Sequence, residues 1–158
     1  MEFDGHRTQR TNLHSVWDSS IARKLNGLGF DAHAVEEKPA AAIWARELKG
    51  RVKGVVGSED PSGGLDLALA DQCTDLADPN HCGIEWATEA NALVCQYILA
   101  PGLGWVKEND LGRGEYYEGA VPVVELQIAR AGVRLAAWVN AIAAVLADAD
   151  AGAGKEDL

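Results

Sequence analysis

The chain has 158 residues, a length that fits one domain and allows a buried core. Hydrophobic residues make up 47% and charged residues 24%, which is an ordinary globular balance. The net charge of −10 argues against a protein that holds nucleic acid through a basic surface. No run of about 18 apolar residues predicts a transmembrane helix, and the first residues lack the apolar segment of a signal peptide.

The first periodic segment follows a polar lead-in. Residues 1–11 carry Gly5 and are predicted to be poorly ordered, with His6 on the surface. From residue 13 to residue 25, apolar side chains recur every three to four positions, as in an amphipathic helix. These are Leu13, Val16, Trp17, Ile21 and Leu25. Asn26-Gly27 then predicts the end of the helix.

A candidate metal site lies at the start of this helix. His14 and Asp18 are four residues apart, and on a helix such residues lie about 5–6 Å apart at Cβ on one face. The imidazole and the carboxylate can therefore converge on one cation, and zinc accepts both ligand types. The alternative is a capping Asp18 beside an ordinary surface His14.

The middle of the chain predicts short helices and loops. Pro39 sits in a first-turn position and opens a helix over residues 40–48. His33 and Glu37 are spaced for an adventitious metal, although a solvated turn is favoured. Glycines, serines and a proline mark a long loop over residues 50–64, and residues 65–77 predict a short helix.

Cys73 and Cys82 flank a polar loop and are candidates for a disulfide in an oxidising compartment. His81 beside Cys82 suggests a zinc site, but the two cysteines lack the paired C-x-x-C spacing of structural zinc sites. A disulfide or two free thiols is favoured.

Residues 84–99 predict a buried helix that ends at Pro101-Gly102. Its expected inner face consists of Ala87, Ala90, Asn91, Val94, Tyr97 and Ile98. Residues 102–114 are predicted to form a loop. Trp105 in that loop is a candidate base-stacking platform, with simple packing as the alternative.

The last helix has the strongest periodicity. Apolar residues step by three or four over residues 121–146, with Pro122 in the first turn. The predicted apolar stripe is Val121, Val124, Ile128, Ala131, Leu135, Trp138, Ile142, Val145 and Leu146. Gln127, Arg130 and Arg134 are predicted to form a solvated stripe opposite it, and Gly132 suggests close approach of another helix. Residues 1–147 are predicted to form one helical domain, and 148–158 a disordered acidic tail.

No alternating strand pattern or phosphate loop appears, so the predicted fold class is all-α. The N-L-H-x-x-W-D motif at residues 12–18 precedes the segments 86–95, 116–117 and 122–136 in an order that resembles the zinc-dependent single-strand nucleases, in their fungal S1/P1 form. The similarity is strong over residues 8–26 and 84–147. It implies the helical zinc fold shared with bacterial phospholipase C.

This resemblance implies hydrolysis of single-stranded DNA and RNA to 5′-phosphorylated products by zinc-bound water. His14 and Asp18 match ligands of one ion in a three-zinc cluster, and Asn12 and Trp17 are expected to orient them. No residue is assigned as a general base. The acidic exterior suits such an enzyme, because the metal ions meet the phosphate.

The sequence departs from the family in one respect. The chain is expected to correspond to the C-terminal half of the family's fold, because the family's further zinc ligands, and the cysteine that the resemblance pairs with Cys95, are expected in an upstream half. Cys95 is therefore expected to be a lone thiol, with a buried free cysteine as the alternative. The family is usually secreted, but no export signal is seen here. The expected partners are therefore single-stranded nucleic acid, no membrane, and a missing N-terminal half or an intact paralogue. The alternative function is a non-catalytic helical remnant that binds such a paralogue.

Overall fold

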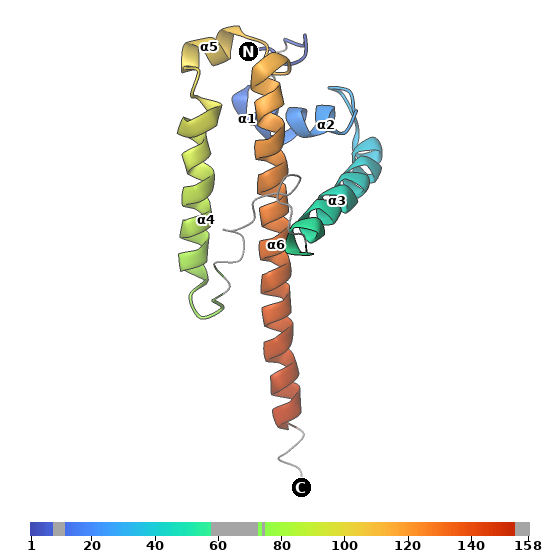
Figure 1. The fold of residues 1–158 in the computed structure, drawn as a ribbon, viewed down its shortest axis with the longest axis vertical. Coiled ribbons are helices and arrows are strands. Elements are labelled where there is room, and N and C mark those ends of the chain that lie inside the picture. Colours follow the sequence, from blue (N-terminus) through green and yellow to red (C-terminus); the bar gives the residue numbers. More distant parts are fainter. Residues whose placement is uncertain (8–11, 58–72, 74, 154–158) are drawn as a thin grey trace.

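The computed structural model of the chain describes residues 1–7, 12–57, 73 and 75–153, and it is built from helices (Figure 1). Within these ranges there is no strand. Isolated β-bridges pair Glu2 with Asp110 and Phe3 with His6. The predicted all-α fold class is confirmed.

The helical elements are, in chain order, α1 (Leu13–Ser15), the π-helix η1 (Val16–Ser20), α2 (Ile21–Leu25), α3 (Ala34–Gly57), α4 (Pro79–Leu93), the π-helix η3 (Val94–Ile98), α5 (Leu103–Glu108) and α6 (Gly114–Ala153).

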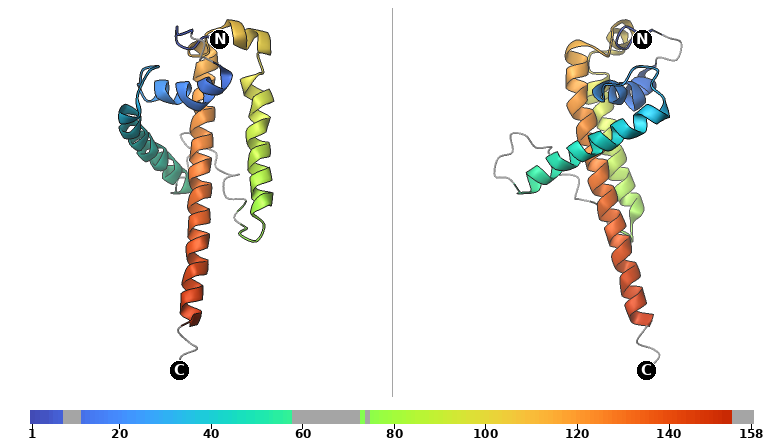
Figure 2. Two further views of the ribbon diagram at one scale, coloured as in Figure 1. Left: turned by 180° about the vertical axis from the view of Figure 1, so that it is seen from behind. Right: turned by 90° about the vertical axis from the view of Figure 1, so that its right-hand side faces the viewer.

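Helix α6 is the spine of the molecule. Helix α4 runs beside it, α1 and α2 lie near its N-terminal end, and α3 crosses it obliquely, as two further views confirm (Figure 2). The main buried cluster lies where α2, α5 and the start of α6 meet the N-terminal residues. It contains Phe3, Val16, Ile21, Val106, Leu111, Tyr116 and Ala120.

The N-terminal residues are packed into this cluster, which corrects the prediction of a poorly ordered lead-in over residues 1–11. Phe3 is only 2% exposed. The Leu111 N–H donates to the Glu2 carbonyl at 3.0 Å, and the Asp4 N–H donates to the Asp110 carboxylate at 2.6 Å. Burial of Phe3 and these long-range bonds hold a segment whose polar composition alone predicts disorder. His6 is exposed as predicted, with its ring stacked on Phe30. Residues 8–11 lie outside the described residues.

Several predicted boundaries are confirmed. The helical run of residues 13–25 ends at Asn26, and Gly27 adopts a φ of +69°. The helix predicted over residues 84–99 ends before Pro101-Gly102, where Gly102 has a φ of +93°. Glycine reaches this left-handed region without steric cost, so both stop signals act through backbone geometry.

Other boundaries differ from the predictions. Helix α3 begins five residues before Pro39 and continues to residue 57, so residues 50–57 are helical rather than part of a loop. Helix α4 begins at Pro79 because the Asp78 carboxylate caps it by accepting from the His81 N–H. In the segment predicted as helix 65–77, residues 73 and 75–77 are not helical, and the others lie outside the described residues.

The predicted loop over residues 102–114 contains helix α5, whose Val106 is fully buried. Helix α6 begins at Gly114, so Pro122 lies inside it rather than in its first turn. The helix also continues to Ala153, past the predicted domain boundary at residue 147, and residues 154–158 lie outside the described part.

The buried face of α6 is not the predicted one. Arg130 and Arg134 are each 8% exposed, because α4 packs on that face and its Glu89 pairs with both guanidinium groups. The predicted solvated stripe is therefore an interface. Likewise, Ala87, Ala90 and Asn91 of α4 are exposed.

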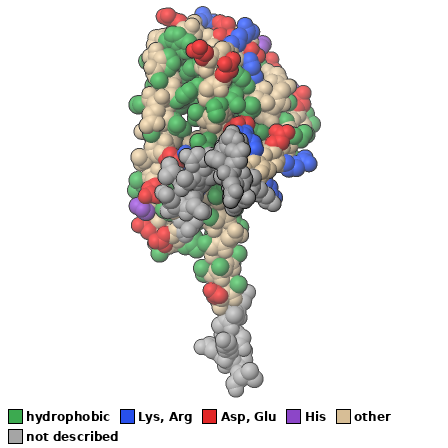
Figure 3. Space-filling model, in the orientation of Figure 1, with side chains coloured by type: hydrophobic (Ala, Val, Ile, Leu, Met, Phe, Trp, Pro, Cys, Tyr) green, Lys and Arg blue, Asp and Glu red, His purple; other side chains and the backbone are tan. Residues whose placement is uncertain are grey.

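The predicted apolar stripe of α6 faces solvent over much of its length in the described structure. Leu135 is 66% exposed and Leu146 62%, and hydrophobic side chains are visible along the lower part of α6 (Figure 3). By length and composition alone, residues 114–148 also qualify as a candidate membrane span, which the sequence analysis did not predict. The core helix of a soluble protein passes the same test, and the absence of a membrane partner stays a prediction.

Candidate metal site

His14 and Asp18 both lie on the exposed side of the first helical segment. His14 belongs to α1 and Asp18 to η1, so the two predicted ligands come from consecutive turns of one continuous helix. No hydrogen bond or ion pair engages the imidazole of His14 among the described residues. The Asp18 carboxylate accepts only a long bond of 3.5 Å from Ser19 Oγ within the same part of the structure. Both side chains are therefore available as ligands.

Asn12 begins this helix through a reciprocal cap. Its side-chain oxygen accepts from the Ser15 N–H at 2.9 Å, and its own N–H donates to Ser15 Oγ at 3.1 Å. This arrangement satisfies two backbone donors that a helix start otherwise leaves unpaired. In the structure Asn12 thus fixes the turn that carries His14. Direct orientation of the ligand by the Asn12 side chain remains a prediction.

The turn that carries Asp18 is a π-helix. The Ile21 N–H donates to the Val16 carbonyl, five residues earlier, and Ser20 Oγ donates to the Ser15 carbonyl at 3.2 Å. Short π-segments inside α-helices are frequent at functional sites. The apolar period of residues 13–25 gives no sign of this extra residue in the turn.

Trp17 anchors the helix to α6. Its Nε1–H donates to the Tyr116 hydroxyl at 3.1 Å, and that hydroxyl donates to the Ile98 carbonyl at 3.0 Å. The Trp17 ring also meets Tyr97 edge-on, with centroids 5.8 Å apart. Burial raises the pKa of Tyr116, so the hydroxyl stays protonated at neutral pH. Trp17 therefore packs and ties its helix to Tyr116, and its role in orienting His14 and Asp18 remains a prediction.

Asp18 borders a pocket of about 240 Å³ between α2 and α3. Arg23 and Glu37 form an ion pair on its wall at 2.6 Å, and Trp44 lines it too. Because the Glu37 carboxylate is engaged by Arg23, the structure gives no support to the adventitious His33–Glu37 metal pair. The pocket places open space next to one of the two candidate ligands.

Among the described residues, no third potential metal ligand lies with His14 and Asp18. The one cluster of three potential ligands in this part of the chain lies elsewhere and is formed by Cys73, His81 and Glu85. Zinc sites use three or four protein ligands. The donor chemistry of His14 and Asp18 fits zinc, and the pair supplies about half of a coordination shell.

A family model for S1/P1 Nuclease matches residues 1–144. The chain belongs to the S1/P1 nuclease family.

Individual relatives agree with this assignment. Nuclease S1 of Aspergillus oryzae is 35% identical over 141 residues, which are 89% of this chain and 43% of the relative. Nuclease P1 of Penicillium citrinum is 33% identical over 140 residues, 89% of this chain and 46% of the relative. Endonuclease 2 of Arabidopsis thaliana is 26% identical over 135 residues. The chain thus spans less than half the length of these relatives.

A second aromatic feature of this S1/P1 family member lies beside Trp17. The Trp105 ring is 40% exposed and lies 5.8 Å from Tyr116 between centroids. Trp105, Tyr97 and Tyr116 border a pocket of about 320 Å³. Trp105 therefore packs in part, in line with the packing alternative of the sequence analysis. Its role as a base-stacking platform remains a prediction.

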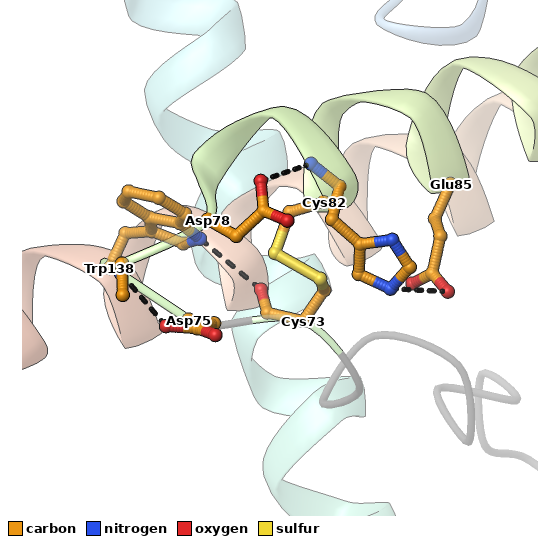
Figure 4. The surroundings of a disulfide bond; sticks show 8 residues. Cys73, Asp75, Asp78, Cys82, Glu85 and Trp138 are labelled. Carbon is orange, nitrogen blue, oxygen red and sulfur yellow. Dashed lines mark hydrogen bonds and ion pairs between the residues drawn. A yellow bond between two sulfur atoms is a disulfide. The ribbon is translucent and has the colours of Figure 1, made fainter.

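The predicted disulfide is present, since Cys73 is bonded to Cys82 with Cα atoms 5.2 Å apart (Figure 4). Trp138 Nε1–H of α6 donates to the Cys73 carbonyl at 3.2 Å, which ties this loop to the spine. Cys95 is a free thiol, as predicted, and it is exposed rather than buried. Its pairing with a cysteine outside this chain remains a prediction.

Proposed function

We propose that this chain carries part of the zinc centre of a nuclease that hydrolyses phosphodiester bonds in single-stranded DNA and RNA, leaving 5′-phosphorylated products. His14 and Asp18 are proposed to hold one zinc ion. Trp17, through Tyr116, holds the helix that presents both ligands, and Asn12 fixes its first turn. The remaining ligands are proposed to come from an upstream half of the enzyme.

The observation that carries this proposal is the position of the N-L-H-x-x-W-D motif. Its histidine and aspartate are exposed on one helix and available as ligands, while its tryptophan points inward to a hydrogen bond with Tyr116. The pocket beside Asp18 offers room for a substrate next to the metal. The family assignment supplies the reaction class.

Zinc bound here would lower the pKa of a water ligand and neutralise charge on the phosphate. This explains how a chain of net charge −10 fits a nucleic-acid substrate, because metal ions rather than lysines meet the phosphate. Two ligands hold zinc weakly. Four-ligand structural sites reach about 10–16 kcal/mol, so half of that corresponds to micromolar affinity or weaker.

The test joins the 158 residues to the upstream part of the Penicillium citrinum relative and measures cleavage of single-stranded DNA with and without zinc. His14→Ala and Asp18→Asn are expected to abolish zinc-dependent cleavage in the fusion while leaving the helical circular dichroism signal unchanged. His33→Ala is the matched control, since it removes an exposed histidine outside the motif. Full activity of the His14→Ala fusion would show that the metal site is assigned wrongly.

A second candidate function is a non-catalytic helical protein that binds an intact paralogue. The observation that favours it is the incomplete donor set: among the described residues, the one group of three potential ligands does not include His14 or Asp18. Cleavage by the fusion separates the two functions: a folded fusion that cleaves single-stranded DNA supports the first function, and a folded fusion that does not supports the second. Robust zinc-dependent cleavage by the unfused chain would exclude the binding role and also contradict the proposal that upstream ligands are needed.

A further inference from the structure

A second group of potential metal ligands lies at the start of α4, in a part of the molecule that the proposed zinc centre does not use. Cys73, His81 and Glu85 each offer one ligand atom, and these atoms all lie within 4.8 Å of one another. His81 Nε2 is 3.3 Å from a Glu85 carboxylate oxygen. Figure 4 shows Cys73, Cys82 and Glu85 gathered around the first turns of α4.

We propose that this cluster is a redox-gated zinc site, closed while Cys73 is bonded to Cys82 and opened when that disulfide is reduced. The proposal is independent of the nuclease function. The oxidised chain offers only a histidine and a carboxylate here, because a disulfide sulfur is not a thiolate and zinc binds thiolate. Reduction adds the third ligand.

The distances suit a tetrahedral ion. Zinc bonds of about 2.0–2.3 Å set neighbouring donor atoms roughly 3.3–3.8 Å apart. The imidazole and carboxylate already have this spacing at 3.3 Å. His81 and Glu85 are four residues apart on α4. The His81 side chain is 62% exposed and the Glu85 side chain 50%. Small rotations therefore bring both side chains toward Cys73 Sγ without disturbing the core.

The fourth position of the ion has room for water. Cys73 and Glu85 both line a pocket of about 320 Å³ that also contacts Glu89 and Arg134. Cys82 is fully buried and is not one of the three clustered ligands. Its role in the proposal is to hold Cys73 as a disulfide when the chain is oxidised.

The chemistry balances with an external reductant. A phosphine donates two electrons to the disulfide, and with one water it becomes the phosphine oxide while two thiols form. Zinc then displaces the proton of the Cys73 thiol, which is released to solvent. The Cys73 sulfur is thus bonded either to the Cys82 sulfur or to zinc, but not to both. A thiolate, imidazole and carboxylate set is typical of zinc and of cobalt that replaces it.

The experiment uses cobalt(II) alone as the probe, because a thiolate bound to cobalt gives a charge-transfer absorption that carboxylates and imidazoles do not. All proteins carry His14→Ala and Cys95→Ser, which remove the first candidate site and the unpaired thiol. The key pair is Cys82→Ser against Cys73→Ser. Both abolish the disulfide, but only Cys82→Ser leaves the Cys73 thiol in place.

We expect Cys82→Ser to show the absorption with one cobalt per chain and no reductant, and Cys73→Ser to show none. The protein with both cysteines should show it only after phosphine treatment, and zinc should displace it. His81→Ala or Glu85→Gln, added to Cys82→Ser, should weaken cobalt binding at least about tenfold, whereas His33→Ala should not.

Three results would overturn the site: no absorption in the reduced protein with both cysteines, equal absorption in the Cys82→Ser and Cys73→Ser proteins, or unchanged affinity in the His81→Ala and Glu85→Gln variants. The reduced protein with both cysteines keeps all three ligands, so a folding defect of one cysteine variant does not leave the question open. Helical circular dichroism is recorded for each protein.

Discussion

Glu89 is the residue that joins α4 to α6. Its carboxylate accepts from Arg130 at 2.7 Å, from Arg134, and from Gln127 at 3.1 Å. Burial raises the pKa of Glu89, but the hydrogen bonds from Arg134, Gln127 and Arg130 lower it more, so the net shift is downward. One acidic side chain therefore neutralises much of the charge of two buried guanidinium groups.

Removal of this carboxylate should destabilise the fold strongly. Glu89→Ala leaves two buried arginines facing the gap, and loss of one partner of a buried ion pair costs about 3–5 kcal/mol. Urea unfolding followed by circular dichroism measures the loss. Glu118→Ala, an exposed glutamate on α6, is the control and should change the free energy of unfolding by less than about 0.5 kcal/mol. Equal effects of the two substitutions would contradict the interface.

The same carboxylate predicts an acid-sensitive fold. Because the pKa of Glu89 in the folded chain lies below its ordinary value of 4.5, the stabilisation is fully present above pH 4.5 and is lost as the pH falls through the folded pKa. The free energy of unfolding should therefore drop below that pH, and less steeply in Glu89→Gln. The pKa of Asp4 is also lowered, by hydrogen bonds from Lys24 and Arg113, and contributes equally to both proteins. Parallel pH profiles would refute the assignment.

At the scale of elements, two glycines of α6 lie in different surroundings: Gly119 is in close contact with another helix, and Gly132 faces open space in the described part of the chain. A Cβ at Gly119 would lie 2.5 Å from the Tyr97 hydroxyl oxygen, whereas a Cβ at Gly132 would meet nothing within 4 Å among the described residues. The close helix contact predicted at Gly132 is therefore absent from the described structure. The residue that does accommodate a neighbour is Gly119, which lies against Tyr97 of η3.

Alanine at these two glycines should act in opposite directions. Alanine exceeds glycine in helix propensity by about 1 kcal/mol, so Gly132→Ala should raise the melting temperature. Gly119→Ala should lower it, because the new methyl group displaces Tyr97 and breaks its hydrogen bond to the Tyr116 carbonyl, which is 2.6 Å long. Thermal unfolding of both variants makes the comparison, and a gain in stability for Gly119→Ala would contradict the contact.

Helix positions could be predicted from the sequence better than helix faces. Asn26-Gly27 and Pro101-Gly102 are local signals, and both ended helices where expected. The faces of α6 depend instead on Glu89, which lies 41 and 45 residues from its two arginine partners. Apolar periodicity assigns charged residues to solvent, so it cannot reveal a buried ion pair. The candidate ligands His14 and Asp18 are predicted from a motif, whereas the π-turn that contains Asp18 leaves no compositional trace.

At the scale of the whole molecule, the described part of the chain exposes an apolar stripe along α6. Leu135 is 66% exposed and Ile142 47%, and contiguous apolar patches on this scale favour association. Leu135→Gln with Ile142→Gln should raise the concentration at which the chain remains monomeric in sedimentation, with little change in melting temperature. Val106→Ala, at a fully buried position, should instead lower the melting temperature. Unchanged self-association in the double variant would show that the stripe does not drive it.

Because η1 is a π-turn, the geometry of the candidate metal site depends on the number of residues in that turn as well as on which side chains are present. A π-turn holds one residue more than the α-helical hydrogen-bonding pattern requires. Deletion of Ser19 would therefore restore an ordinary α-helix without breaking it. The π-turn and the α-turn that replaces it each complete about one rotation, so His14 would keep its direction relative to α2. Asp18 lies inside the altered turn and would be the ligand that is displaced, although both ligands would remain in the sequence.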